Sequence, residues 1–540
     1  MRVSLRLLAA VALAVAAAPA AARVAAPFPA GFRWGAAISG FQSDMGLDAP
    51  NDPGSDWWAW VHDPANVEAG RVSGDVPEDG PGFWTRYAAD AKLAKKTLKL
   101  NAFRFGIEWS RIFPTSTAGV DTSGGIDAAD LEALDALADQ AAVAHYRDVL
   151  AALRARRLDP LVTVNHFSLP LWVHEPLGVR DAFVGVDALT GPVPPGLERA
   201  GWLDAATVVE FEKLCAYVGW KLGDLADRWA TLNEPVVVLV SGYLNAPGIG
   251  GNFPPGVFNF DAVRTAIPNL VMAHARGYDA LHANDTVDAD GDGAAATVGI
   301  VHNMGAFHPA NPQSAADVEA ASHATYLFDE VLPLALTAGA FDANLDGDAL
   351  DEGESRPDLA DRLDWFGVNY YNRITVTALG GPLTPLVPLL DFIPTISYRT
   401  PENPNAPECP TTCTEFGWEI YPEGLGEVLA IAGGFGLPIY VTENGIADAD
   451  DDQRARFVYD HLAVLQQTIA DGTADVRGYY HWSLTDNFEW SSGYYPRFGL
   501  ARYDPASGKR RVRKGATVLR TIAKKNGITR KLQKRFGTPE

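Results

Sequence analysis

The sequence predicts one (β/α)8 barrel with long loops at the carboxyl-terminal face of its strands. Eight short β-type runs occur along the 540 residues, longer helical patterns separate them, and several runs are apolar almost throughout. Parallel strands that are buried on both faces have this continuous apolar character, and successive parallel strands require a crossover segment, usually a helix. Nothing in the chain marks a second folded domain, so we expect the barrel to occupy residues 23–540.

The expected strands follow one another at spacings that leave room for a helix after each. They are residues 32–39, 102–110, 159–167, 228–235, 297–305, 363–371, 437–445 and 476–484. Apolar residues recur with helical periodicity in the segments 83–100, 141–158, 206–224 and 453–472. Segments rich in Pro and Gly, which we expect as loops at the barrel mouth, are 173–202, 244–260 and 376–418.

The first residues have the pattern of a secretory signal peptide. Arg2 and Arg6 precede an apolar stretch at 7–18, and a run of small residues at 20–22 follows it as a cleavage site. The apolar stretch is too short to span a bilayer as a stable helix. We therefore expect residues 1–22 to be removed and the mature protein to be secreted, either to the periplasm or to the outside of the cell. We expect no stable insertion into the membrane.

The charge of the chain is negative overall and uneven. Its formal net charge is −23, which argues against a general binder of nucleic acid or of anionic membranes. Residues 505–540 nevertheless carry 12 Lys or Arg and one Glu, a local charge of +11. We expect a basic terminal helix and tail lying on an acidic body, and a tail that binds polyanions is the alternative.

The three cysteines differ in their surroundings. Cys409 and Cys413 lie in a loop rich in Pro and Thr, where an oxidising compartment would allow a small disulfide loop. Geometry decides whether that bond forms, and the sequence leaves it open. Cys215 lies in a helical pattern and is expected to be a buried, inert thiol.

Two acidic loops have the Asp-x-Asp/Asn-x-Asp-Gly order of calcium-binding loops. They are "DADGDG" at 288–293 and the segment "DANLDGD" at 342–348. Neither has a Glu at the twelfth position, so solvated turns are the favoured interpretation and a structural calcium ion is the alternative. Neither interpretation implies a catalytic metal.

Polar and aromatic side chains gather at the ends of several expected strands. In a barrel of this kind, side chains at the carboxyl ends of the strands face the active site. The residues at these ends are Asn165-His166, Asn233-Glu234, Asn369-Tyr370-Tyr371, Glu443-Asn444 and His481-Trp482. Stability alone does not explain such a set, and the sequence therefore predicts an active site at this rim.

Two carboxylates at this rim, Glu234 and Glu443, lie on the fourth and seventh expected strands. Their side chains could meet over the centre of the barrel. A pair of carboxyl groups with aromatic neighbours suits cleavage of glycosides, with one group protonated and the other ionised. A separation of about 5 Å would indicate retention of configuration and about 6.5–9.5 Å inversion, a choice the sequence leaves open.

Five stretches, in the same order along the chain, resemble the signatures of one family. They are "FRFGIEWSRIFP" (103–114), "TLNEP" (231–235), "FGVNYY" (366–371), "YVTENG" (440–445) and "HWSLTDNFEWSSGYYPRFGL" (481–500). The chain thus resembles glycoside hydrolase family 1, the β-glucosidase family, and in particular its archaeal-type β-glycosidases. The resemblance extends from "FRWGAAISGFQ" (32–42) to the basic C-terminal segment.

The resemblance implies a role for each residue at the reacting centre. Glu234 matches the family's acid/base, and Glu443 matches its nucleophile. Asn233 would bind the sugar 2-hydroxyl. Tyr371 and Arg104 would orient Glu443 and keep it ionised, and Asn369 would support the same site.

The resemblance also implies a pocket for the non-reducing sugar. Its residues would be Gln42, His166, Trp482, Glu489, Trp490 and Phe498, with Trp418 as a wall of the leaving-group side. Taken singly, His166 or either Trp would be a packing residue, and the complete set favours the functional interpretation. Glu489 would repel a phosphate, so the resemblance implies unphosphorylated substrates. The chemistry of the two carboxyl groups requires no cofactor.

Two stretches depart from the family pattern. The segment 42–46 reads "QSDMG", with a shorter acid and one residue more than the usual Gln-x-Glu-Gly, and "NHFSLP" replaces the commoner His-Trp-Asp-Leu-Pro. We expect a retaining exo-β-glycosidase for β-glucosides, with some action on β-galactosides or β-fucosides. The alternatives are a non-catalytic sugar-binding barrel and an enzyme that mainly transfers glycosyl groups to acceptors. The natural aglycone and the oligomeric state are left open.

Overall fold

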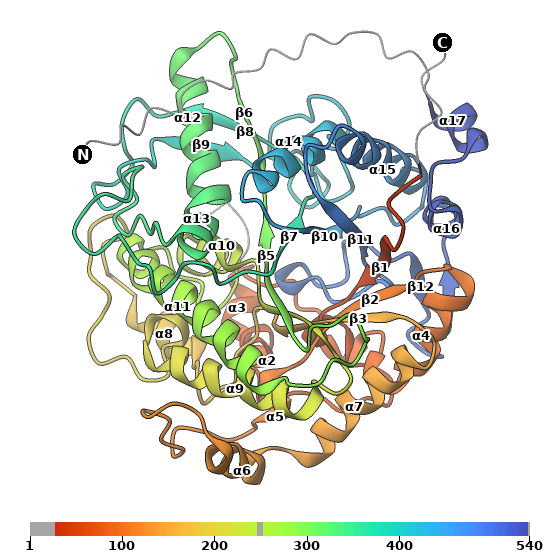
Figure 1. The fold of residues 1–540 in the computed structure, drawn as a ribbon. Helices are drawn as coiled ribbons and strands as arrows, with labels where there is room; N and C mark the ends of the chain where they lie inside the picture. The colour runs from red at the N-terminus through yellow and green to blue at the C-terminus, as the bar shows by residue number, and fades with distance from the viewer. Residues whose placement is uncertain (1–26, 246–251, 538–540) are drawn as a thin grey trace, which may run out of the picture.

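Eight parallel strands form a closed barrel at the centre of the protein (Figure 1). The structure is a computed structural model and describes residues 27–245 and 252–537. Around the barrel, the hydrogen-bonded order of the strands is β1-β11-β10-β7-β5-β4-β3-β2. Their bounds are β1 (Arg33–Ala37), β2 (Ala102–Gly106), β3 (Asp159–Asn165), β4 (Arg228–Asn233), β5 (Thr297–Asn303), β7 (Trp365–Asn369), β10 (Ile439–Asn444) and β11 (Val476–Trp482). The predicted (β/α)8 barrel is confirmed.

Helices surround the barrel, as the predicted alternation of strands and helices requires (Figure 1). The main ones are α4 (Phe83–Lys92), α7 (Gln140–Arg154), α9 (Ala206–Leu222), α11 (Phe260–Asn284), α13 (Val331–Ala338), α14 (Pro422–Gly433) and α15 (Arg454–Ala470). In α7 the buried side chains include Val143, Tyr146, Leu150 and Leu153, at spacings of three and four residues. This spacing places one apolar face of the helix against the barrel.

The strands are buried along nearly their whole length, which explains their continuous apolar character. Every residue of β2, β4 and β10 is buried. Among them Arg104, inside β2, is a charged residue with no exposed surface. A buried charge is costly unless it is paired, so its partners define the centre of the barrel.

The long Pro- and Gly-rich segments contain short elements that the sequence did not predict. The segment 173–202 includes α8 (Pro176–Ala182), which begins with a proline at its first turn. The segment 376–418 includes β9 (Phe392–Thr395), which pairs with β8 (Arg373–Ala378) in a small sheet that also contains β6 (Ala306–Pro309). A disulfide joins Cys409 and Cys413, whose Cα atoms are 6.1 Å apart. Cys215 is a buried free thiol, as predicted.

The basic C-terminal region forms two short helices rather than the single helix we expected. α16 (Ala516–Lys525) ends at Asn526, whose φ of +49° interrupts the helix, and α17 (Arg530–Phe536) begins after the N-cap Thr529. Before them, Arg510 pairs with Asp90 at 2.7 Å and Arg513 pairs with Asp486 at 2.8 Å. The basic region is therefore partly neutralised by the body of the protein.

The predicted signal peptide, residues 1–22, lies outside the residues that the structure describes. Within residues 27–245 and 252–537, no helix combines the length and the apolarity needed to cross a bilayer.

Candidate active site

Side chains from seven barrel strands or the residues just after them meet at one rim of the barrel. All eight strands run in parallel, so their carboxyl ends lie at the same end of the barrel. His166, Glu234 and Tyr371 follow β3, β4 and β7, while Glu443 is the last residue but one of β10. This arrangement brings residues that are hundreds of positions apart in sequence into direct contact.

Glu443 is a buried carboxylate held by two strong donors. It is 3% exposed, and Arg104 Nη1 donates to its Oε1 at 2.5 Å. The Tyr371 hydroxyl donates to its Oε2 at 2.6 Å. Both oxygens therefore accept a hydrogen bond, and a guanidinium in contact with a carboxylate stabilises its ionised form. Burial and the charge of Glu443 raise the pKa of Tyr371 well above its usual range, so this phenol remains a donor.

Glu234 is buried next to Glu443, but amides surround it instead of cations. Asn369 Nδ2 donates to its Oε1 at 2.6 Å, and Asn303 Nδ2 donates to the same oxygen at 3.1 Å. Burial, followed by the negative charge of Glu443, raises the pKa of Glu234 to about 8. Glu234 is therefore protonated at neutral pH in the free protein.

The backbone at Glu234 has a conformation that non-glycine residues seldom adopt. Its φ is +48° and its ψ is 60°, in the left-handed region. Pro235 follows and disfavours the right-handed helical conformation for the residue before it. Left-handed non-glycine residues cost free energy and cluster at functional sites. The left-handed conformation thus occurs at one of the two carboxyl groups of the site.

Arg104, Asn233 and Asn369 link the two carboxyl groups through hydrogen bonds, and Thr442 orients Asn369. Thr442 Oγ1 donates to Asn369 Oδ1 at 2.7 Å, which leaves the Asn369 amide nitrogen to face Glu234 and Asn233 Oδ1. Arg104 Nη2 also donates to Asn233 Oδ1, at 2.7 Å. One guanidinium therefore orients both Glu443 and Asn233.

His166 completes this network as a neutral imidazole. Asn233 uses its Oδ1 as an acceptor twice, so its Nδ2 donates to His166 Nε2 at 3.2 Å. Burial and the nearby charge of Arg104 lower the pKa of His166 well below its usual range. The ring proton then resides on Nδ1, a buried atom that has no hydrogen-bond partner among the residues that the structure describes. This N–H is free to donate to a ligand.

A second polar group surrounds the carboxyl of Glu489. Asn487 Nδ2 donates to its Oε2 at 2.9 Å, and Gln42 Nε2 donates to the same oxygen at 3.3 Å. Trp482 forms a further side-chain hydrogen bond with Glu489. Burial raises the pKa of Glu489 to about 7, and the charge of Glu443 adds to this effect. Glu443 and Glu489 are therefore close enough to influence each other.

Aromatic rings form the walls around these polar groups. The His166 ring lies nearly parallel to those of Trp482 and Trp490, with centroids 5.8 and 5.9 Å apart. On another side, Trp418 lies 5.2 Å from Tyr371 and 5.9 Å from Phe498 between ring centroids. The structure thus connects all thirteen predicted site residues into one cluster.

A model of glycosyl hydrolase family 1 matches residues 24–184 and 192–528. The chain belongs to this family. The match spans the whole barrel, including every strand that contributes to the cluster. The resemblance inferred from the five motifs is confirmed.

The similarity between this family 1 chain and its relatives extends over nearly its full length. A β-galactosidase of Pyrococcus woesei is 39% identical over 524 residues, which cover 94% of this chain and 99% of the relative. The crystal structure of the β-glycosidase from Thermosphaera aggregans has a TM-score of 0.80 and 34% identity, and the similarity covers 95% of this chain and all of that one. The β-glucosidase of Pyrococcus furiosus has a TM-score of 0.77 and 34% identity, with the same coverage.

This family 1 chain is accordingly a glycoside hydrolase that cleaves O-glycosyl bonds, and a retaining β-glycosidase. Retention requires two carboxyl groups about 5 Å apart, one of which forms a covalent intermediate. That separation stays a prediction for Glu234 and Glu443. Their shared hydrogen-bond network, through Arg104, Asn233 and Asn369, agrees with close placement.

Two residues of the family 1 site were missed by the sequence interpretation. Asn303, at the end of β5, contacts Glu234, and Asn487 contacts Glu489. An Asn at a strand end is also typical of a turn or cap, so only its position on the fifth strand could have indicated Asn303. The neighbouring Asp486 instead pairs with Arg513.

Proposed function

We propose that the protein is an exo-acting β-glycosidase that hydrolyses unphosphorylated β-glucosides and also accepts β-galactosides or β-fucosides. Glu443 is the nucleophile and Glu234 is the general acid/base. The observation that carries this assignment is the contrast between two neighbouring carboxyl groups: Arg104 and Tyr371 stabilise the charge of Glu443, while burial keeps Glu234 protonated. Groups with opposed environments of this kind are suited to acid and nucleophile roles.

In the first step, Glu443 Oε attacks the anomeric carbon while Glu234 donates its proton to the glycosidic oxygen. The bond from the anomeric carbon to that oxygen breaks, the aglycone leaves with the proton, and a glycosyl ester forms on Glu443. Arg104 and Tyr371 hold the nucleophile in one orientation before the reaction, which reduces the entropy lost on attack.

In the second step, water replaces the aglycone. Burial and the charge of Glu443 both raise the pKa of Glu234, and esterification removes that charge, so the pKa falls and the Glu234 carboxylate can act as a base. This anion takes a proton from water as the water attacks the anomeric carbon. Glu443 is released as a carboxylate, Glu234 is protonated again, and the sugar leaves with its original configuration.

The residues around Glu489 and His166 form the proposed site for the non-reducing sugar. His166 Nδ1 offers a donor, Glu489 offers acceptors, and Trp490 and Trp482 offer ring faces for the apolar side of a pyranose. Asn233 is oriented by Arg104 and contacts the sugar 2-hydroxyl. Names of relatives include both β-glucosidase and β-galactosidase, which supports acceptance of both sugars.

We expect 6-phosphorylated β-glucosides to be poor substrates. The side chains that contact Glu489 are the neutral Gln42, Asn487 and Trp482, so a phosphate there would meet a carboxyl group and no cation. Unfavourable charge contacts of this kind cost several kcal/mol, so kcat/KM should fall about 100-fold or more. Matched nitrophenyl β-glucosides with and without the phosphate test this, and equal kcat/KM values would contradict it.

We expect the activity to decline above pH 8, and we expect Asn303→Ala to move that decline to higher pH. Protonated Glu234 is the active form, and its pKa of about 8 sets the basic limb of kcat/KM. The Asn303 amide lowers that pKa by donating to Glu234, so its loss raises the pKa. One lost hydrogen bond should also reduce kcat/KM by about fivefold.

The pH profile of kcat/KM for an aryl β-glucoside measures both effects. Asn269→Ala is the matched control, because Asn269 lies on α11 outside the barrel and donates to the backbone oxygen of Trp202. Its basic limb should stay in place. A basic limb that Asn303→Ala leaves unchanged, or moves to lower pH, would contradict the assignment of that limb to Glu234.

We also propose export of the protein. The N-terminal pattern of residues 1–22 is that of a secretory signal, and a Cys409–Cys413 disulfide is typical of oxidising compartments. Mass measurement of protein from the culture medium or the periplasm tests this. A chain that keeps residues 1–22 and stays in the cytoplasm would contradict it.

A further inference from the structure

The acidic loop 288–293 lies at the end of the barrel opposite the active site. It connects α11, which ends at Asn284, to β5, which begins at Thr297. Asp227 immediately precedes β4, and Glu234 immediately follows it, so about 20 Å of strand separates the two residues. The proposed chemistry makes no use of this loop.

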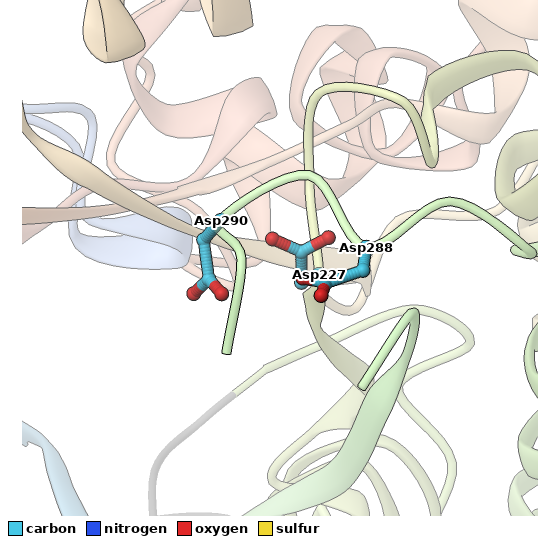
Figure 2. A group of neighbouring side chains, drawn as sticks. All are labelled: Asp227, Asp288 and Asp290. Carbon is cyan, nitrogen blue, oxygen red and sulfur yellow. The ribbon is translucent and has the colours of Figure 1, made fainter. Parts of the chain in front are cut away.

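Three carboxylates from two segments of the chain converge there. Oxygen atoms of Asp227, Asp288 and Asp290 lie within 4.8 Å of one another. Figure 2 shows Asp288 and Asp290 on the loop, with the Asp227 side chain between them in this view. Two ligands on opposite sides of a calcium ion are about 4.8 Å apart, since Ca²⁺–oxygen distances are about 2.3–2.6 Å.

The loop is already folded around its first aspartate. The backbone N–H groups of Gly291 and Gly293 donate to the Asp288 carboxylate at 2.7 and 3.0 Å. Gly293, at the sixth position of the motif, has a φ of +102°, which favours glycine. The twelfth position, where calcium loops have an acidic ligand, is Gly299 inside β5. Asp227 reaches the cluster from the neighbouring strand instead.

Asp227 provides an observation independent of the acidic motif. It is only 4% exposed, and within residues 27–245 and 252–537 its buried Oδ2 has no hydrogen-bond partner. Its Oδ1 accepts from the Ala289 N–H at 2.7 Å, which fixes the carboxylate against the loop. A buried carboxylate oxygen that has no donor is costly, and native proteins satisfy most such atoms with protein, water or ions.

The nearest basic residues do not satisfy this oxygen. Arg154 Nη1 lies 3.8 Å from Asp227 Oδ2, beyond hydrogen-bond length, and its guanidinium donates to the backbone oxygens of Leu225 and Ala289. Arg228 donates to Asp159 at 2.6 Å. The group of carboxylates therefore retains repulsion that a cation would relieve.

We propose that Asp227, Asp288 and Asp290 bind a calcium ion that attaches the 288–293 loop to the base of the barrel. The ligands are all carboxylate oxygens, which favour hard cations over zinc. The spacing suits Ca²⁺ better than Mg²⁺, whose ligand distances of about 2.0–2.1 Å demand a tighter, more regular group. Asp288 and Asp290 are exposed, so water completes the coordination.

The two other acidic loops satisfy their carboxylates within the protein. Both oxygens of Asp448, in the group with Asp450 and Asp452, accept backbone N–H groups. In the 342–348 loop, the Asn344 amide donates to the carboxylates of Asp346 and Asp351. Backbone N–H groups also donate to both oxygens of Asp288, so the difference lies in the buried member of each group. Both oxygens of Asp448 have a donor, whereas Asp227 Oδ2 has none within the described residues, which is why the proposal concerns the 288–293 loop.

Calcium titration of chelator-treated protein tests the proposal. We expect calorimetry to detect a bound Ca²⁺ ion in the wild-type protein that Asp290→Asn binds at least tenfold more weakly. Asp290→Asn keeps the oxygen that accepts from the Asp292 N–H, so the loop should still fold. At calcium 100 times the dissociation constant, the wild-type Tm should rise by about 2–3 °C. The kcat/KM should change less than twofold, because the site is remote from Glu234.

Asp450→Asn is the matched control. Asp450 is also exposed, also lies in an acidic loop, and also accepts from the N–H two residues later. It should retain the calcium response. Asp227→Asn provides a second readout. Without calcium, the Tm of this variant should equal or exceed the Tm of the wild type. With calcium, it should be lower than the Tm of the wild type. Absence of binding by the wild type, or equal losses in Asp290→Asn and Asp450→Asn, would overturn the proposal.

Discussion

Glu443→Ala is expected to lower kcat/KM for an aryl β-glucoside by about 10⁴-fold or more, with the fold intact. Removing a covalent nucleophile eliminates the two-step route, and effects of 10⁴–10⁶ are typical. Azide should restore part of the activity, because it fits the space left by the carboxylate and attacks the same face of the anomeric carbon. The product of that rescue should be the α-glycosyl azide.

Steady-state kinetics with and without azide, followed by analysis of the product, measure this prediction. Glu132→Ala, an exposed residue on α6 (Ala128–Leu137), is a control that should leave kcat/KM unchanged. Loss of Glu443 also leaves Arg104 without its buried anionic partner, so a melting temperature should accompany the kinetics. Full activity in a folded Glu443→Ala variant would rule out its role as nucleophile.

Glu234→Ala is expected to lose more activity with leaving groups that must be protonated as they depart than with leaving groups that are stable as anions. For a poor leaving group such as an alkyl alcohol or a second sugar, the loss should be about 10²–10⁴-fold, the usual contribution of general acid catalysis. For dinitrophenolate, which departs without a proton, glycosylation should be nearly unaffected. Hydrolysis of the intermediate should then become rate-limiting, since the general base is also lost.

A series of aryl β-glucosides with leaving groups of different pKa measures the second prediction. The slope of log kcat/KM against leaving-group pKa should be much steeper for Glu234→Ala than for the wild type. The matched variant Asn303→Ala keeps the carboxyl group and should retain the shallow wild-type slope. A uniform loss across the series would contradict the acid role of Glu234.

The barrel itself could be predicted from sequence because its signals are local. Runs such as 437–445 are apolar almost throughout, and the intervening helices have a clear apolar face, as α7 shows. Elements inside the long loops were missed because their signals are weak. α8 has seven residues in a Pro- and Gly-rich segment, and the break at Asn526 depends on one residue with a positive φ.

The reacting carboxylates could be predicted because each lies at the end of an expected strand, within a motif that resembles a family signature. Asn303 and Asn487 could not, because an amide in a turn has the same local pattern whether it caps the backbone or contacts a carboxyl group. The contact between Asp227 and the 288–293 loop could not be predicted from the sequence either. Asp227 lies some 60 positions earlier, and only the pairing of β4 with β5 brings it to the loop.

The central claim is that Glu443 forms a covalent bond to the sugar while Glu234 remains free. A 2-deoxy-2-fluoro-β-glucoside with a good leaving group tests this most directly. The fluorine slows both the formation and the hydrolysis of the glycosyl ester, and the good leaving group keeps its formation fast enough to be observed. Peptide mass mapping of the inactivated enzyme should find one fluoroglucosyl group on Glu443. An adduct on Glu234 or elsewhere, or turnover with inversion and no adduct, would contradict the account.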